Sequence, residues 1–215
     1  DREMSGRVGV EEALGAMEGA HVEAAAFQQP AQRIAHGFVV VDEHQRTSRE
    51  HIWALGDVCD HHLLKHVANA QARVVQHNLL HPDEPIARPA EPVPQAIFGQ
   101  PPVLTVGATE EALREAGTEY VKVVQPYDTV AYGWALDDRT SFVKLLVDPA
   151  TRLLLGAGVI GPEAPELGQL LVAAMSFGID VGTMARGQYW AHPELAEVVE
   201  NAPEGFLSQP LDAAG

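Results

Sequence analysis

A histidine and a carboxylate stand five residues apart near the end of the chain, in the run His192-Pro193-Glu194-Leu195-Ala196-Glu197. Proline suits the first turn of a helix, so we expect a helix to begin at Pro193, with His192 at its cap and free to point at a ligand. A carboxylate that accepts from one imidazole nitrogen fixes the tautomer and leaves the other nitrogen for proton transfer. The spacing therefore predicts an acid/base pair of His192 and Glu197, although a helix start without a catalytic role can have the same sequence.

A second group of candidate residues follows the short apolar run of residues 52–55, which predicts a buried strand. The strand would end in Gly56-Asp57, at the carboxyl edge where α/β sheets bind ligands. Gly56 would let a cofactor approach the backbone, and Asp57 offers an acceptor to a hydroxyl group.

A helix is expected to start soon after this turn and to run to about Leu80, with its first residues at Lys65, His66 and Val67. The exposed N–H groups and the dipole at such a start favour partial negative charge on a bound ring system. Turn and helix together are typical of a cofactor site, but a tight turn and a core helix would give the same pattern. His61, His62 and His66 crowd this stretch, yet no cysteine or acid pair completes a recognised metal ligand set, so we predict exposed loop histidines and no metal site.

The two motifs, in this order and at this separation, resemble the carboxyl-terminal part of the pyridine nucleotide-disulfide oxidoreductases, flavoenzymes that include glutathione reductase and dihydrolipoamide dehydrogenase. The resemblance covers about residues 37–202 and is closest to the members that reduce mycothione. The segments that carry it are residues 40–43, 45–48, 63–69, 72–80, 130–135, 175–178 and 184–190.

The resemblance implies that the intact protein uses FAD and NADPH to reduce a low-molecular-weight disulfide, mycothione, to its thiol. His192 would be the acid that protonates the departing thiolate, with Glu197 rather than Glu194 as its partner. FAD contacts are implied at Gly56, Asp57 and the backbone N–H groups of Lys65, His66 and Val67. A homodimer is also implied, in which His192 and Glu197 act on the flavin and redox cysteines of the other subunit.

The chain has one cysteine, Cys59, which suits a reducing compartment such as the cytoplasm. The cysteine pair and the glycine-rich fingerprints of the family are absent; we interpret residues 156–161 as a strand that passes into a turn. We therefore expect a fragment with an incomplete FAD site that is inactive alone. Two alternatives remain open: a relative of dihydrolipoamide dehydrogenase or glutathione reductase, and a non-catalytic dimerisation module.

The elements that would position these residues form two domains. Residues 37–87 are predicted to be the end of an α/β FAD-binding domain, residues 88–94 a proline-rich linker, and residues 95–215 an α+β dimerisation domain, an antiparallel sheet with helices on one face. The second domain is expected to have strands at residues 103–107, 129–136, 141–147 and 153–160, and helices at residues 109–117 and 165–177. Its dimer interface is expected at residues 142–159 and 165–177. Residues 1–36 match the family poorly, with a helix at residues 22–27 suggested by propensity alone.

Charge and hydropathy exclude other classes of protein. The formal net charge is −16, and no segment supplies the basic stripe that nucleic acid binding requires. No apolar run reaches the length that spans a membrane.

Overall fold

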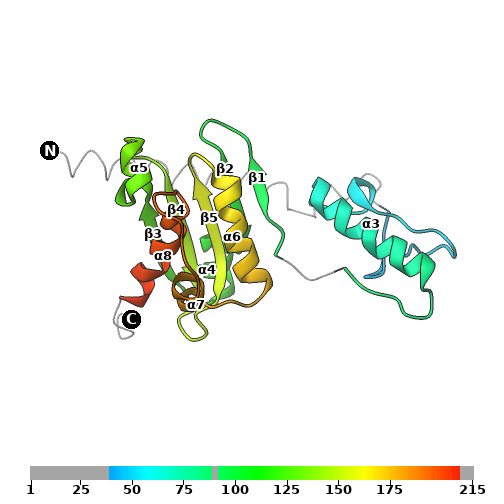
Figure 1. Ribbon diagram of the computed structural model, residues 1–215. Coiled ribbons are helices and arrows are strands. Elements are labelled where there is room, and N and C mark those ends of the chain that lie inside the picture. The colour runs from blue at the N-terminus through cyan, green and yellow to red at the C-terminus, as the bar shows by residue number, and fades with distance from the viewer. Residues whose placement is uncertain (1–38, 89–91, 209–215) are drawn as a thin grey trace. The chain divides into compact units, whose positions relative to one another are not determined.

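The computed structural model describes residues 39–88 and 92–208, which fall into two compact units that meet in the chain near residue 90 (Figure 1). The suggested helix at residues 22–27 lies outside the described residues, and the domain boundaries given above remain predictions. No helix in the described part of the chain is long and apolar enough to cross a bilayer.

The first unit is built around helix α3, Lys65–Leu80, which confirms the helix predicted there. Its buried side chains recur at helical spacing, on Val67, Gln71, Val74 and Asn78. Asn78 also ties the helix to the segment that follows, because its amide donates to Ile86 O at 3.0 Å and accepts from Ile86 N at 2.8 Å.

The strand predicted at residues 52–55 is wrong. Trp53 makes an isolated bridge with Arg46, and Ile52 and Leu55 are 54% and 38% exposed. A strand needs neighbours on both sides to bury an apolar run, and among the described residues this run has only the bridge to Arg46. The chain then enters the short 3-10 helix η1, Gly56–Val58.

The second unit contains a five-stranded sheet in which every pairing is antiparallel, with the strand order β1-β2-β5-β4-β3. The strands are β1 Gln95–Ile97, β2 Val103–Gly107, β3 Val121–Pro126, β4 Phe142–Val147 and β5 Leu154–Ile160. The antiparallel sheet confirms the predicted fold class and the strands predicted at residues 103–107, 141–147 and 153–160. β5 ends directly before Gly161, so the glycine-rich run is a strand and a turn, as predicted.

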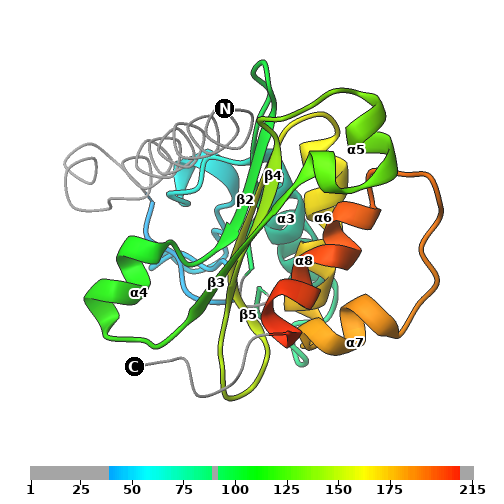
Figure 2. The same cartoon turned by 90° about the vertical axis from the view of Figure 1, so that its left-hand side faces the viewer.

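Helices α6, Ala164–Ser176, α7, Val181–Arg186, and α8, Glu197–Leu207, gather on one face of the sheet (Figure 2). Side chains alternate along a strand, so the apolar residues of β4 that face these helices are Val143, Leu145 and Val147. They pack with a buried row from α6 and α8 made of Leu167, Leu171, Val198, Val199 and Ala202. Helix α4, Glu110–Ala116, lies on the opposite face (Figure 2), where its Glu110 reaches Lys144.

The strand predicted at residues 129–136 is wrong. The segment forms the 3-10 helix η2, Tyr127–Thr129, and the short helix α5, Ala131–Ala135, while the sheet uses β3 instead. Gly133 is required here, since a Cβ at this position would lie 1.9 Å from Tyr127 O. This close contact accounts for the glycine between the two aromatic residues, and Trp134 beside it is 75% exposed.

The interface predicted at residues 142–159 is wrong for β4, which the fold buries within one chain. Phe142, Val143, Leu145 and Val147 are all 0% exposed, so their side chains have no surface to offer to a second subunit. α6 keeps an exposed apolar side chain, Leu170 at 37%, and Phe177 at its C-cap is 79% exposed.

Helix α4 has the threonine cap and terminal glycine that its sequence predicts. Thr109 Oγ1 accepts from Ala112 N at 3.0 Å, and Gly117 closes the helix at a φ of 66°. We expect Thr109→Ala to destabilise the chain by about 1 kcal/mol, because an amide of the first turn loses its acceptor. Urea unfolding of the purified chain measures this, with the exposed Thr118→Ala as the control that should stay within about 0.5 kcal/mol of the parent. Equal effects of the two substitutions would contradict the capping role.

Candidate functional site

His192 and Glu197 are in direct contact. Nδ1 of His192 lies 2.8 Å from Oε1 of Glu197, and the other carboxylate oxygen accepts from Glu194 N at 3.2 Å. The His192 side chain is 67% exposed and that of Glu197 is 17% exposed. The imidazole therefore faces solvent while its partner is held against the protein.

The segment before the pair is fixed by two side chains that bond back to α7. Trp190 Nε1 donates to Ala185 O at 2.9 Å and Gln188 Nε2 donates to Met184 O at 3.2 Å. The helix predicted to begin at Pro193 instead begins at Glu197, so that prediction is wrong. The chain turns once more before the helix, and Leu195, which is 0% exposed, anchors this turn in the core.

The electrostatics of the pair favour an ionised Glu197. The hydrogen bond with His192 lowers the pKa of the Glu197 carboxyl, burial opposes this, and the amide of Glu194 lowers it further. At neutral pH the carboxylate consequently accepts the Nδ1 proton and leaves Nε2 of His192 available for proton transfer. One helical turn later, burial and the charges of Glu197 and Glu204 raise the pKa of Glu200.

The second predicted group lies in the first unit, on η1 and at the start of α3. Gly56 has a φ of 75°, a left-handed conformation that favours glycine, and its N–H donates to Gln71 Oε1 at 2.6 Å. A Cβ on Gly56 would lie 3.5 Å from the Cβ of Ala68, so the turn packs directly on α3. The Asp57 side chain beside it is exposed.

The start of α3 suits a partly negative ligand. Its N-cap, Leu64, provides no side-chain acceptor, and no acidic residue stands in the first turn. Lys65 and His66 are exposed there, while Val67 is buried in the core. The Asp57 carboxylate can accept a hydrogen bond from a hydroxyl group, and the start of α3 has backbone N–H donors. Together these groups fit part of an FAD site.

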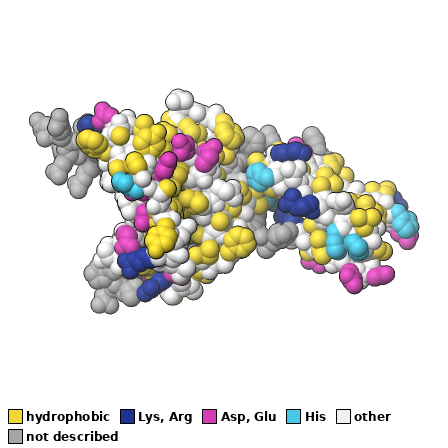
Figure 3. Space-filling model, viewed as in Figure 1, with side chains coloured by type: hydrophobic (Ala, Val, Ile, Leu, Met, Phe, Trp, Pro, Cys, Tyr) yellow, Lys and Arg dark blue, Asp and Glu magenta, His cyan; other side chains and the backbone are white. Residues whose placement is uncertain are grey.

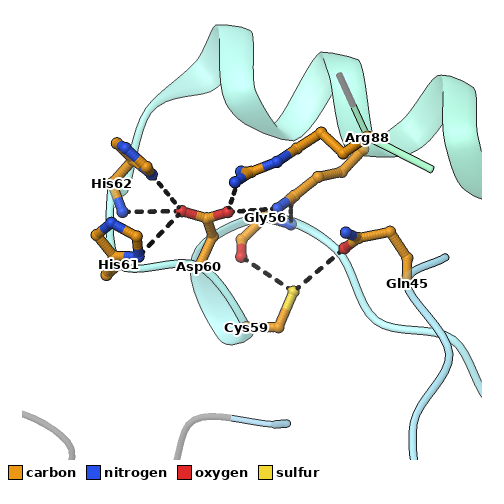
Figure 4. A network of polar contacts seen from close by, with 8 residues as sticks. Gln45, Gly56, Cys59, Asp60, His61, His62 and Arg88 are labelled. Atoms are coloured by element: carbon orange, nitrogen blue, oxygen red, sulfur yellow. Dashed lines mark hydrogen bonds and ion pairs between the residues drawn. The ribbon is translucent and has the colours of Figure 1, made fainter. Parts of the chain in front are cut away.

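A buried polar network beside this turn was missed by the sequence analysis (Figure 4). At its centre is Asp60, which accepts from His62 N at 2.9 Å, His62 Nδ1 at 2.8 Å, Gln71 Nε2 at 2.6 Å and Arg88 Nη1 at 2.7 Å. His62 is 9% exposed, so the prediction of exposed loop histidines is wrong for it, while His61 is exposed. Gln71 could have indicated the network from the sequence, because it falls among the apolar positions of α3 and a buried amide requires polar partners.

Asp60, His61 and His62 also bring potential metal ligand atoms within 4.8 Å of one another. Both oxygens of Asp60 are already engaged, and Oδ2 lies 2.7 Å from the Arg88 guanidinium. A divalent cation there would compete with this ion pair, so the geometry favours a structural role for the carboxylate.

The surface of the described residues is mixed in charge on the face that Figure 3 shows, where Lys and Arg stand in small, separate groups among acidic and apolar side chains. Exposed aromatic side chains include Tyr189, three residues before His192, and Trp134 on α5.

Two family models match the chain. Residues 93–203 match the dimerisation domain of the pyridine nucleotide-disulphide oxidoreductases, and residues 18–73 match a second pyridine nucleotide-disulphide oxidoreductase model. Among curated proteins, the chain is 48% identical to mycothione reductase of Mycobacterium tuberculosis over 183 residues, which cover 83% of this chain and 40% of that protein. It is 35% identical to dihydrolipoyl dehydrogenase of Haloferax volcanii over 179 residues, or 81% of this chain and 36% of that protein.

The chain is also similar in fold to a solved structure. The HOCl-induced flavoprotein disulfide reductase RclA from Escherichia coli superposes with a TM-score of 0.72 at 26% identity, over 79% of this chain and 39% of that one. The chain thus spans about 40% of the length of the mycothione reductase that it matches. With its five-stranded antiparallel sheet and both family matches, this chain belongs to the pyridine nucleotide-disulfide oxidoreductases.

Proposed function

We propose that the intact protein is an FAD-containing, NADPH-dependent reductase of a low-molecular-weight disulfide, mycothione, and that this chain supplies its acid/base pair. The contact of 2.8 Å between His192 and Glu197 carries the proposal, since it occurs in a chain that is 48% identical to a mycothione reductase. The chain would also supply part of the FAD site, at Gly56, Asp57, Lys65, His66 and Val67.

The pair acts as a proton donor to the sulfur that leaves when the disulfide is cleaved. Glu197 accepts the proton of Nδ1, which fixes the orientation of the ring, while Nε2 carries the proton that is transferred. An imidazole suits this step because its ordinary pKa range lies close to neutral pH. Protonation of the departing thiolate keeps it from attacking the new disulfide and reversing the exchange.

FAD, when bound, supplies the passage of electrons from the nicotinamide to the redox disulfide of the family. The Asp57 carboxylate would accept a hydrogen bond from a hydroxyl of its ribityl chain. The N–H groups of Lys65, His66 and Val67 would donate to the edge of the ring that becomes more negative on reduction.

A homodimer in the cytoplasm completes the proposal. The match to a dimerisation domain supports a second copy as the partner, and the pair would then act on the flavin and cysteines of the opposite subunit. The thiol of Cys59 is free, as expected of a reducing compartment.

A comparison of substrates tests the proposal. The intact protein is assayed with mycothione, oxidised glutathione and oxidised lipoamide, each with NADPH and with NADH. We expect the highest kcat/KM with mycothione and NADPH. A preference for lipoamide would move the protein to the dihydrolipoyl dehydrogenases, with which the chain also shares 35% identity. A stable dimer that reduces none of the three would favour the non-catalytic dimerisation module.

A further inference from the structure

The amide of Gln71 joins the two parts of the candidate FAD site directly. Gln71 lies on α3 and is 1% exposed. Its Oε1 accepts from Gly56 N at 2.6 Å, and its Nε2 donates to Asp60 Oδ2 at 2.6 Å. Gln71 therefore holds the backbone of the Gly56-Asp57 turn against α3, and Asp60 holds the Gln71 amide in place.

The orientation of the amide follows from its partners. Gly56 N–H is a donor and can meet only the oxygen, whereas an ionised Asp60 can meet only the NH₂ group. Burial alone would raise the pKa of Asp60, but the hydrogen bonds from His62 and the charge of Arg88 hold that pKa below its ordinary value. A flipped amide would break both bonds in a buried place, where an unpaired polar group is costly.

The network lies outside the contacts proposed for FAD. Gln71 and Asp60 are 1% and 7% exposed, whereas the contacts proposed for FAD are the Gly56-Asp57 turn and the backbone N–H groups at the start of α3. What the two side chains fix is the separation between the Gly56-Asp57 turn and the first turn of α3, because Gln71 is on the same rigid helix as Lys65, His66 and Val67.

We infer that Gln71, oriented by Asp60, is a positioning residue that sets the Gly56-Asp57 turn at the correct distance from the start of α3 for FAD to contact both. The inference rests on the proposed function. It assigns to Gln71 an effect on cofactor affinity beyond its contribution to the stability of the fold.

Gln71→Glu tests the inference with a group that can be switched. A protonated carboxyl has one donor and one acceptor, so it can replace the amide toward Asp60 and Gly56 N; an ionised one faces Asp60 with like charge. The other titratable groups around this position are Cys59, His61, His62 and Arg88. Because these groups are present in every variant, the ratio of the Kd of each variant to the Kd of the parent at the same pH removes the contribution of their titration.

The measurement is the Kd for FAD of the intact protein, from the flavin spectrum after titration of the apoprotein, between about pH 5 and about pH 9. We expect Gln71→Glu to bind FAD about tenfold more weakly than the parent at the alkaline end and equally well at the acid end. Gln71→Met, which cannot make either bond, should be about tenfold weaker throughout. The controls are Gln76→Glu and Gln76→Met on the exposed side of the same helix, which should match the parent.

Two results would overturn the inference while leaving the proposed function intact. One is an FAD affinity of both Gln71 variants equal to that of the parent, even if their melting temperatures fall. The other is a weakening in Gln71→Glu that does not depend on pH, since a merely structural role would not follow the protonation of the new carboxyl. A parent protein that binds no FAD would instead overturn the proposed function itself, and the inference with it.

Discussion

Replacing His192 by alanine should lower the turnover of the intact protein by roughly a hundredfold or more, without a change in its flavin spectrum. The exposed imidazole lies on a turn whose anchor is Leu195, and its contact is to Glu197, so its removal leaves the core in place. Loss of the proton donor makes the thiolate a poorer leaving group, and the step that slows is disulfide exchange with the substrate.

Steady-state rates with the disulfide, together with the flavin spectrum and the dimer mass, separate this effect from damage to the fold. His51→Ala removes another exposed histidine, 83% accessible at its side chain, and should leave the rate unchanged. A His192→Ala variant that turns over at the parental rate would remove His192 from the mechanism.

The partner carboxylate gives a graded version of the same test. Glu197→Gln keeps an acceptor for Nδ1 but replaces a hydrogen bond to a charged carboxylate with a weaker one to a neutral amide, so its rate should fall between those of the parent and His192→Ala. Glu194→Gln is the matched control. The Glu194 side chain is exposed, and it is the backbone N–H of this residue that bonds to Glu197.

Sequence reasoning succeeded where a local pattern is sufficient. The helix of α4 has its cap, its early acids and its terminal glycine within nine residues, and α3 and α6 show apolar residues at helical spacing. The pairing of His192 with Glu197 also followed from spacing and resemblance, although the helix begins at Glu197 instead of Pro193. Proline permits a helix start at its position but does not require one, and the burial of Leu195 decides where this helix begins.

The failures occurred where distant parts of the chain decide the outcome. Residues 129–136 alternate like a strand, but the neighbouring position beside β4 is occupied by β3, whose exposed and half-buried residues gave little signal. The Asp60 network depends on Gln71 and Arg88, which lie 11 and 28 residues away. No spacing rule connects such residues, because the fold brings them together.

The largest effect on stability that we expect comes from the buried ion pair of Glu110 and Lys144, on the face of the sheet that α4 covers. Lys144 and Glu110 have side chains only 4% and 7% exposed, and Lys144 Nζ lies 3.1 Å from Glu110 Oε1. Nζ of Lys122, whose side chain is 43% exposed, lies 3.2 Å from the other oxygen. Removal of one partner from such a pair leaves an uncompensated buried charge, which costs about 3–5 kcal/mol.

Glu110→Gln should accordingly destabilise the purified chain by about 3 kcal/mol or more in urea unfolding, because Lys144 remains without a counter-charge. Glu111→Gln, on the next and exposed residue of α4, should change the stability by less than about 0.5 kcal/mol. Combining Glu110→Gln with Lys144→Met removes both charges, and the double variant should regain much of the loss, since well-packed apolar groups replace a buried ion pair at little cost. If the loss of stability in the double variant equals the sum of the losses in Glu110→Gln alone and Lys144→Met alone, the two side chains are not coupled and the expected cause is wrong.

The Glu110–Lys144 pair should also make the free energy of unfolding depend on pH in the acid range. Burial alone would raise the pKa of Glu110, but the hydrogen bonds and charges of Lys144 and Lys122 hold it below its ordinary value of 4.5. A carboxyl whose pKa is lowered by folding adds stability above its unfolded pKa, and this stability is lost as the pH falls through the folded value. Urea midpoints measured from neutral pH down through this acid range should therefore fall more steeply for the parent than for Glu110→Gln, because the variant has already lost the contribution. Equal slopes for the two proteins would show that Glu110 is not held in its ionised form by the lysines.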